Sequence, residues 1–174
     1  GLSVHLQPVD PERDEIRGDT STIPVMDLGL VEDINDLQVG RVSALAGHVA
    51  VECIAKSVAL AMKGTVKGIA TTPINKEALK KAEYHYIGHT EMLAELSKSR
   101  DSVTMFLVDT MKIFFHSRHK SLKQMIEDLS VEGIVHSIRL ADRCLASLNI
   151  NDRKLALAAL NPHASDGGLF GDEE

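Results

Sequence analysis

The sequence predicts an α/β protein with a mainly parallel sheet flanked by helices. Two short runs, 66–71 and 155–160, have the length of strands in a central sheet, and the second of them is wholly apolar. Helical patterns cover 40–63 and 131–148, so strands and helices alternate after residue 40. This alternation is typical of α/β proteins whose sheet is substantially parallel.

Two segments are expected along the chain. The first, 1–39, is the end of a first-domain segment with loops and short strands at 3–8 and 23–28. The second, 40–174, is a central α/β segment that carries the substrate and metal motifs described below.

The strongest helix is predicted over 40–63. Its apolar side chains recur at helical spacing, as Val51, Ile54, Val58 and Ala61. Nearly all other positions are small or aliphatic, so we expect a mostly buried helix that ends at Gly64.

The remaining elements follow from capping residues and β-rich runs. They are a helix 76–82 capped by Asn75, a helix 90–96, a hairpin of strands 103–108 and 112–115, a helix 122–129 capped by Ser121, and a helix 131–148 capped by Ser130. The last helix is expected to pack through one apolar face, formed by Ile134, Ile138, Ala141, Leu145 and Leu148.

Charge and hydropathy argue against several classes of partner. The net charge is −6 and the cations are scattered, so we expect no nucleic-acid partner. The sequence has no run of eighteen uncharged apolar residues, so we expect no membrane span. Residues 1–20 do not resemble a signal peptide, and a cytoplasmic location is expected.

Three histidines, His89, His119 and His163, lie where a strand or loop meets a helix. An imidazole at a strand end needs little reordering to bind a divalent ion, which favours His119 and His163 as ligands. Catalytic metal sites commonly use three protein ligands, and a third would have to come from elsewhere. The alternative is an ordinary surface or hydrogen-bonded histidine. That alternative is preferred for His5, His48, His85 and His136, whereas His116 is ambiguous because it lies three residues from His119.

Lys76 is a candidate for binding an anion. It lies at the start of the predicted helix 76–82, where backbone N–H groups would suit a phosphate or a carboxylate. A solvated lysine in a plain strand-to-helix turn is an equally good interpretation. The glycine-rich stretch 167–171 is not a dinucleotide-binding fingerprint, because it lacks the G-x-G-x-x-G spacing.

Three motifs complete the pattern: Thr72-Pro73-Ile74-Asn75-Lys76, Gly88-His89-Thr90-Glu91, and Asn161-Pro162-His163-Ala164 with Gly167-Gly168 and Gly171-Asp172-Glu173-Glu174. In this order and at about this spacing, they resemble the 4-hydroxythreonine-4-phosphate dehydrogenase family of pyridoxal phosphate biosynthesis. The resemblance covers essentially the whole chain, although 1–39 match only loosely.

The resemblance implies an isocitrate/isopropylmalate dehydrogenase-like fold, incomplete at both ends. It also implies an NAD-dependent enzyme, a homodimer, that uses a divalent metal (Zn, Mg or Co) to oxidise and decarboxylate a phosphorylated hydroxy acid such as 4-phosphooxy-L-threonine. His89 and Thr90 would then contact the substrate, with Lys76 nearby. His119, which a gapless match from Gly88 favours over His116, and His163 would bind the metal. The resemblance assigns no catalytic or cofactor-binding residue within this chain.

One departure from the family pattern bears on which substrate is predicted. The family's first metal motif usually reads Thr-His-x-Pro, whereas this chain has Arg118-His119-Lys120-Ser121. This variant is more similar to the sister group that acts on 4-phospho-D-threonate or 4-phospho-D-erythronate. A further alternative is an α/β fragment that has lost its activity, and we expect the isolated chain to show no dehydrogenase turnover.

Overall fold

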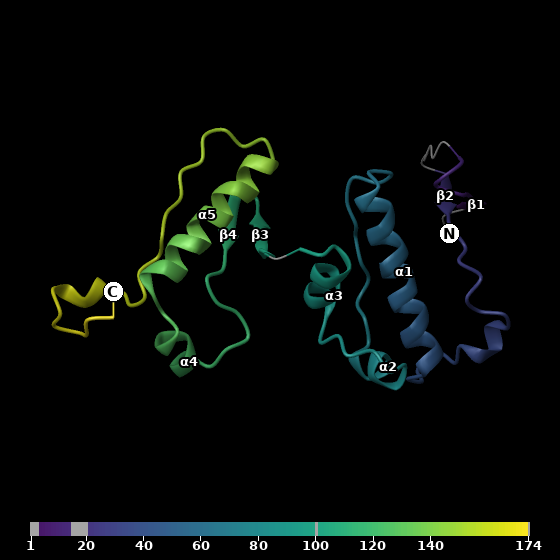
Figure 1. Ribbon diagram of the computed structural model, residues 1–174, viewed down its shortest axis with the longest axis horizontal. Coiled ribbons are helices and arrows are strands. Elements are labelled where there is room, and N and C mark those ends of the chain that lie inside the picture. The colour runs from purple at the N-terminus through teal and green to yellow at the C-terminus, as the bar shows by residue number, and fades with distance from the viewer. Residues whose placement is uncertain (1–3, 15–20, 100, 174) are drawn as a thin grey trace. The chain divides into compact units, whose positions relative to one another are not determined.

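The computed structural model describes residues 4–14, 21–99 and 101–173 (Figure 1). The chain divides into two compact units, Gly1–Ser102 and Val103–Glu174. The structure does not test the expected boundary between the segments 1–39 and 40–174, so that boundary stays a prediction.

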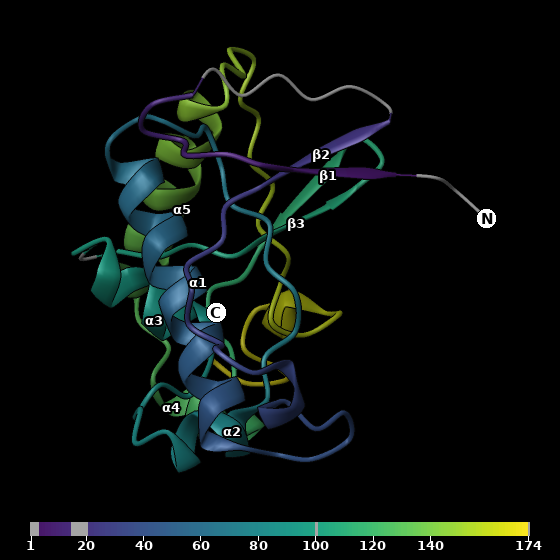
Figure 2. The ribbon, with the colours of Figure 1, turned by 90° about the vertical axis from the view of Figure 1, so that its right-hand side faces the viewer.

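The first unit begins with a small parallel sheet. Strands β1 (His5–Pro8) and β2 (Thr22–Val25) pair in parallel, with His5 opposite Thr22, and lie side by side in Figure 2. Both strands were expected from the sequence. A 3-10 turn, η1 (Ile34–Asp36), follows, and its N-cap Asp33 accepts a hydrogen bond from the backbone N–H of Asn35.

Helix α1 (Ala44–Met62) is the longest element of the chain. The side chain of its N-cap, Ser43, accepts a hydrogen bond from the backbone N–H of Ala46 at 3.2 Å. The helix ends at Met62. Two residues later, Gly64 has a φ of +77°, a left-handed conformation that glycine adopts without steric cost.

The expectation that α1 is mostly buried was wrong. Five of its residues are buried, and Cys53 is exposed. The physical reason is that α1 packs closely through one face against α2 (Lys76–Lys81) and α3 (His89–Leu96), so most of its other positions are only partly covered. The resulting core consists of Val51, Ile54, Val58, Leu79 and Met92.

Helices α1 and α2 approach each other closely. A Cβ atom on Gly47 would lie 2.2 Å from the carbonyl oxygen of Ala78. As expected, Asn75 caps α2, and its side chain accepts a hydrogen bond from the backbone N–H of Ala78 at 2.9 Å.

Among the described residues, α1 alone is long and apolar enough to cross a membrane by length and composition. The core helix of a soluble protein meets the same two criteria. Since α1 contributes three of the five core residues of the first unit, its apolar composition has a structural explanation.

The second unit begins with the predicted hairpin. Strands β3 (Met105–Val108) and β4 (Met111–Phe114) pair antiparallel. Helices α4 (Leu122–Glu127) and α5 (Val131–Ser147) follow, and a short turn, η2 (Ala164–Asp166), lies near the end. Ser121 and Ser130 cap the two helices as expected. After α5 the chain turns back and runs beside that helix (Figure 1).

Two expected strands, 66–71 and 155–160, do not form. A strand is defined by backbone pairing with a neighbour, and neither segment has a backbone hydrogen bond to another described residue. The expected apolar face of α5 is also only partly buried. Ala141 and Leu145 are covered, whereas Ile138 and Leu148 are exposed, because little of the unit packs against that face.

Candidate functional site

His89 is the first residue of α3 and has a ring nitrogen without a partner. The N-cap of the helix, Gly88, has no side chain to bond the N–H groups of the first turn. The Nε2 atom of His89 is buried and makes no hydrogen bond within the described part of the chain. An unsatisfied buried polar atom costs about 1–3 kcal/mol, and a polar ligand at this position would remove that cost.

Thr90 and Lys76 are the other expected substrate contacts in the first unit. Thr90 is the second residue of α3 and is exposed. Lys76 is the exposed first residue of α2. The side chain of Asn75 already bonds the backbone N–H of Ala78 in that helix. The start of α2 is therefore less available to an anion than the sequence suggests.

His119 lies in the second unit, in the loop between β4 and α4. It is exposed, has a φ of +56°, and makes no hydrogen bond, ion pair or ring contact with another described residue. Its two neighbours are anchored. Arg118 donates a hydrogen bond to the hydroxyl of Thr104, and Lys120 donates one to Asp128 at 2.5 Å. The loop is thus held from both sides while the His119 imidazole faces solvent.

His116 is tied to α5. Its Nδ1 atom lies 2.9 Å from the hydroxyl oxygen of Ser137, and its ring lies 3.3 Å from the position of a Cβ atom on Gly133. Sequence reasoning did not find this contact with Ser137, because nothing in a local pattern pairs two residues 21 positions apart. It gives the ambiguous histidine a structural role.

His163 immediately precedes η2. Its backbone N–H donates to the side-chain oxygen of Asn161 at 2.8 Å, which shapes the Asn-Pro-His turn. Its ring stacks on Phe170 with the centroids 4.8 Å apart, and its Nδ1 lies 3.8 Å from a carboxylate oxygen of Asp166. Neither ring contact was expected, although Asp166 lies one helical turn away. The His163 side chain remains 61% exposed.

The expected site residues are divided between the two units. His89, Thr90 and Lys76 belong to the first, and His119 and His163 belong to the second. Within the second unit, no described contact joins the two histidines. Their imidazoles have the donor chemistry for a divalent ion such as Zn²⁺. However, the residues that the structure describes contain no group of three His, Cys, Asp or Glu side chains that could hold a metal ion.

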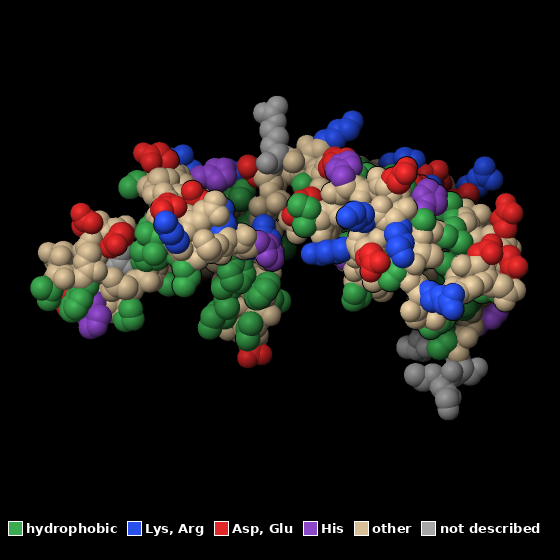
Figure 3. Space-filling view, turned by 90° about the horizontal axis from the view of Figure 1, so that it is seen from below, with side chains coloured by type: hydrophobic (Ala, Val, Ile, Leu, Met, Phe, Trp, Pro, Cys, Tyr) green, Lys and Arg blue, Asp and Glu red, His purple; other side chains and the backbone are tan. Residues whose placement is uncertain are grey.

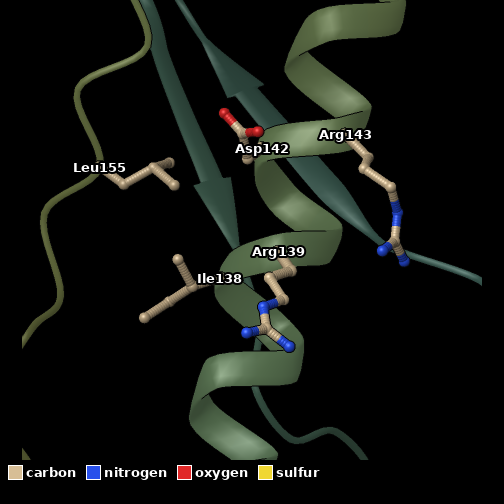
Figure 4. Close-up of a pocket in the computed structure, with 5 residues that line it drawn as sticks. All are labelled: Ile138, Arg139, Asp142, Arg143 and Leu155. Carbon is tan, nitrogen blue, oxygen red and sulfur yellow. The ribbon is translucent and has the colours of Figure 1, made fainter.

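Neither of two cavities in the described part of the chain is lined by an expected site residue. One, of about 420 Å³, is a shallow hollow beside α5, lined by Ile138, Arg139, Asp142, Arg143 and Leu155 (Figure 4). The other, of about 400 Å³, lies in the first unit, where Leu6, Val25 and Val49 contribute to an apolar lining.

Comparison with known proteins gives a family match along nearly the whole chain. The family model described as "Pyridoxal phosphate biosynthetic protein PdxA" matches residues 2–174. A relative from Clostridium botulinum strain Hall is 44% identical over 161 residues, and one from Fusobacterium nucleatum is 47% identical over 150 residues. Both carry the name "Putative D-threonate 4-phosphate dehydrogenase". These matches cover 92% and 86% of this chain but 48% and 45% of the relatives.

Two crystal structures extend the likeness to the fold. A 4-hydroxythreonine-4-phosphate dehydrogenase from Klebsiella pneumoniae superposes with a TM-score of 0.88 at 38% identity, and one from Burkholderia phymatum with 0.85 at 30%. Each match covers 98% of this chain and about half of the solved chain, 52% and 51% respectively. The expected α/β fold class is thereby confirmed, and the chain spans about half the length of the curated relatives it matches. This chain belongs to the PdxA family of pyridoxal phosphate biosynthetic proteins.

Proposed function

We propose that this chain serves a dehydrogenase that oxidises a phosphorylated hydroxy acid, with NAD as hydride acceptor and with loss of carbon dioxide. The family match over residues 2–174 and the dehydrogenase names of the relatives support this proposal. Because the chain spans about half of those relatives, the activity is proposed for an enzyme of their full length. The 174-residue chain alone is expected to show no turnover.

D-threonate 4-phosphate is the favoured substrate. The relatives at 44% and 47% identity carry that substrate in their name, whereas the solved structures named for 4-hydroxythreonine 4-phosphate are 38% and 30% identical. The motif Arg118-His119-Lys120-Ser121 also favours this substrate, because it departs from the usual Thr-His-x-Pro and is more similar to the group that acts on 4-phospho-D-threonate. 4-Phosphooxy-L-threonine and 4-phospho-D-erythronate are the second choices.

The buried, unpartnered Nε2 atom of His89 is the observation that carries the proposal. It lies at the start of α3, where the positive end of the helix dipole favours a phosphate or a carboxylate. We assign His89 and Thr90 to the anionic part of the substrate. Lys76 would add a positive charge at the start of α2.

His119 and His163 are the proposed metal ligands. When bound, a divalent ion (Zn, Mg or Co) supplies Lewis acidity at the oxygens of the substrate. The chain's contribution is to hold neutral imidazoles in place. Arg118 and Lys120 fix the loop of His119, and Asn161 fixes the turn of His163. Because protonated imidazole cannot ligate, metal affinity should fall at acidic pH.

The substrate assignment is tested by calorimetric titration of the chain with D-threonate 4-phosphate. His89→Ala should weaken binding by about tenfold to a hundredfold, the effect of losing one hydrogen bond to a charged group. His85→Ala is the matched control, because His85 lies four residues earlier and is exposed. Equal affinity of the His89 variant and the wild-type chain would contradict the assignment.

The metal assignment is tested with a second pair of variants. His119→Ala should lower the affinity for Zn²⁺, whereas His116→Ala should leave it nearly unchanged, because the structure ties His116 to Ser137. The reverse outcome would transfer the ligand role to His116. A homodimer and a cytoplasmic location are also proposed, and sedimentation of the purified protein tests the first of them.

A further inference from the structure

The segment 82–88 connects α2 to α3 and leads directly into His89 (Figure 1). Gly88, the N-cap of α3, has a φ of −177° and a ψ of −173°, so the backbone is extended where it enters the helix. Gly88 has no side chain and makes no capping hydrogen bond through one. Apart from the packing of α3 itself, the position of His89 therefore depends on contacts made earlier in the segment.

Tyr84 ties this segment to α1. Its hydroxyl oxygen lies 2.9 Å from Nδ1 of His48, and its hydroxyl group donates a hydrogen bond to a carboxylate oxygen of Glu52 at 3.4 Å. His48 and Glu52 are four residues apart, so they lie on the same face of α1 and one hydroxyl can contact both. The ring of Tyr84 also packs against the core of the first unit.

The chemistry of the three groups fixes the direction of both hydrogen bonds. The Glu52 carboxylate can only accept, so it receives the single proton of the Tyr84 hydroxyl. Burial, followed by the charge and hydrogen bond of Glu52, raises the pKa of Tyr84, so the hydroxyl keeps its proton at neutral pH. The hydroxyl oxygen then accepts from His48, whose Nδ1 must carry a proton. Each hydrogen bond of such a continuous chain polarises and strengthens the next.

Tyr86 ties the same segment to α3. Its hydroxyl donates a hydrogen bond to a carboxylate oxygen of Glu95 at 3.0 Å, and its ring stacks beside that of Tyr84 with the centroids 6.3 Å apart. Met92 of α3 is 0% exposed and lies in the core with residues of α1. The segment is thus anchored to both helices, and the second anchor lies three residues before His89.

The surface charge of the first unit makes the position of individual side chains important. On the face seen in Figure 3, basic and acidic side chains are interspersed over this unit, and the net charge of the whole chain is −6. An anionic substrate meets no broad positive field on such a face. Its binding would depend on accurately placed groups such as the buried Nε2 atom of His89.

We propose that His48, Glu52 and Tyr84 are positioning residues, whose hydrogen-bond chain holds the segment 82–88 against α1 and thereby places His89 for the anionic part of the substrate. The inference rests on the proposed function, from which it takes the role of His89. Support of this kind matters because a binding group must be held to within about 0.5 Å of its productive position. The three residues act through His89, and no contact with the substrate is assigned to them.

Amide hydrogen exchange tests the structural step in the 174-residue chain. The N–H of Met92 donates to the carbonyl of Gly88 at 3.3 Å, so its exchange rate reports whether the start of α3 stays in place. Tyr84→Phe removes the hydroxyl and keeps the ring, and it should speed exchange at Met92 by at least about threefold. The N–H of Leu79, which bonds the carbonyl of Asn75 in α2, is the internal control and should not change.

Two variants at Glu52 separate hydrogen bonding from packing. Glu52→Ala removes the acceptor and should speed exchange at Met92. Glu52→Gln keeps an oxygen acceptor and should restore most of the wild-type protection. Glu77→Ala is the matched control, because this carboxylate lies on α2 and pairs with Lys81.

The tautomer of His48 is a spectroscopic test of the same chain. Nitrogen-15 NMR at mildly alkaline pH, where imidazole is neutral, should show the proton on Nδ1 in the wild-type protein. Tyr84→Phe removes the acceptor of that proton and should shift the ring toward the tautomer with the proton on Nε2.

A double-variant cycle connects the chain of hydrogen bonds to substrate binding. In calorimetric titration with D-threonate 4-phosphate, Tyr84→Phe should weaken binding by about threefold to tenfold. In the His89→Ala background the same change should have no further effect, because Tyr84 acts through His89. If the wild-type chain does not bind this substrate, the proposed function fails, whereas the exchange and NMR measurements still decide whether His89 is positioned in this way.

Four results would overturn the proposal. Exchange at Met92 could be the same in the wild-type chain and in Tyr84→Phe. Exchange at Met92 and Leu79 could rise equally, which would show a general loss of stability. His48 could carry its proton on Nε2 in the wild-type chain, which would mean that no continuous chain exists. The losses of substrate affinity in Tyr84→Phe and His89→Ala could be additive, which would show that the two residues act independently.

Discussion

Gly47 sets the separation of the first two helices of the first unit. A Cβ atom at this position would lie 2.2 Å from the carbonyl oxygen of Ala78, a distance that real contacts do not reach. Gly47→Ala should therefore lower the free energy of unfolding by about 1–3 kcal/mol, although alanine is the better helix former. Urea denaturation measures the change. Gly68→Ala is the control, since nothing lies within 4 Å of its Cβ position and it should change stability by less than about 0.5 kcal/mol.

Tyr84 and Tyr86 are the only tyrosines, and the chain has no tryptophan. Burial, followed by the charge and hydrogen bond of Glu52, raises the pKa of Tyr84 above 10.0. Glu52→Gln should lower this pKa only part of the way back, because burial, the larger cause, remains. The near-ultraviolet absorbance of tyrosinate measures the titration, and it is recorded in a Tyr86→Phe background so that Tyr84 is the one tyrosine that contributes. Glu77→Gln is the control, because its carboxylate pairs with Lys81.

The raised pKa of Tyr84 also determines whether the free energy of unfolding rises or falls at alkaline pH. Burial, with a hydrogen bond from the hydroxyl to Glu95, also raises the pKa of Tyr86. In an unfolded chain the pKa of tyrosine is about 10. Below that pH, both tyrosines are protonated in the folded and in the unfolded state, so they add no pH dependence to the free energy of unfolding. Above it, the unfolded chain releases protons first, so the free energy of unfolding should fall until the pH passes the raised pKa values. A constant free energy of unfolding across this alkaline range would contradict the assignment.

At the residue scale, the assignment of the site stays a prediction, and the structure adds the contacts of each candidate side chain. The position of His119 after the hairpin marked it as a candidate, and the structure leaves its ring free of contacts within the described residues. The Ser137 contact of His116 and the Phe170 contact of His163 could not be predicted, since each depends on how the chain folds back on itself.

At the scale of elements, the helices were more predictable than the strands. A helix satisfies its hydrogen bonds within its own segment and its ends are marked by caps, so Asn75, Ser121 and Ser130 were identified from sequence alone. A strand needs a partner elsewhere in the fold. The runs 66–71 and 155–160 have the composition of strands, but the described residues offer them no partner. The hairpin was predictable because its two strands are adjacent in sequence.

The cap of α1 gives a prediction at this scale. Ser43→Ala removes the side chain that accepts a hydrogen bond from the backbone N–H of Ala46, and it should cost about 1 kcal/mol of unfolding free energy. Ser57→Ala is the matched control inside the same helix. The Ser57 hydroxyl bonds the carbonyl of Cys53, which is already bonded in the helix, so its loss should be neutral or slightly stabilising. Equal losses from both variants would contradict the assignment of Ser43 as the cap.

At the scale of the whole molecule, the family could be predicted from motifs, but whether the expected site residues lie close together could not. The motifs are local sequence patterns, so the order of those that contain Lys76, His89 and His163 was enough to identify the family. Convergence depends on contacts between elements. The five expected site residues are divided between the two units.

The uneven distribution of buried side chains predicts that the two units unfold separately. Leu79 is 1% exposed and packs within the core of the first unit, whereas the second unit has few buried side chains. Leu79→Ala should cost about 2–5 kcal/mol through the cavity it leaves, and it should speed amide exchange in α1 by at least about thirtyfold. Exchange in α5 should not change. Leu169→Ala, at an exposed position of the second unit, should affect neither helix. Equal acceleration in α1 and α5 by Leu79→Ala would instead show that the two units unfold as one cooperative structure, because a cavity in one core can weaken the other only through shared packing.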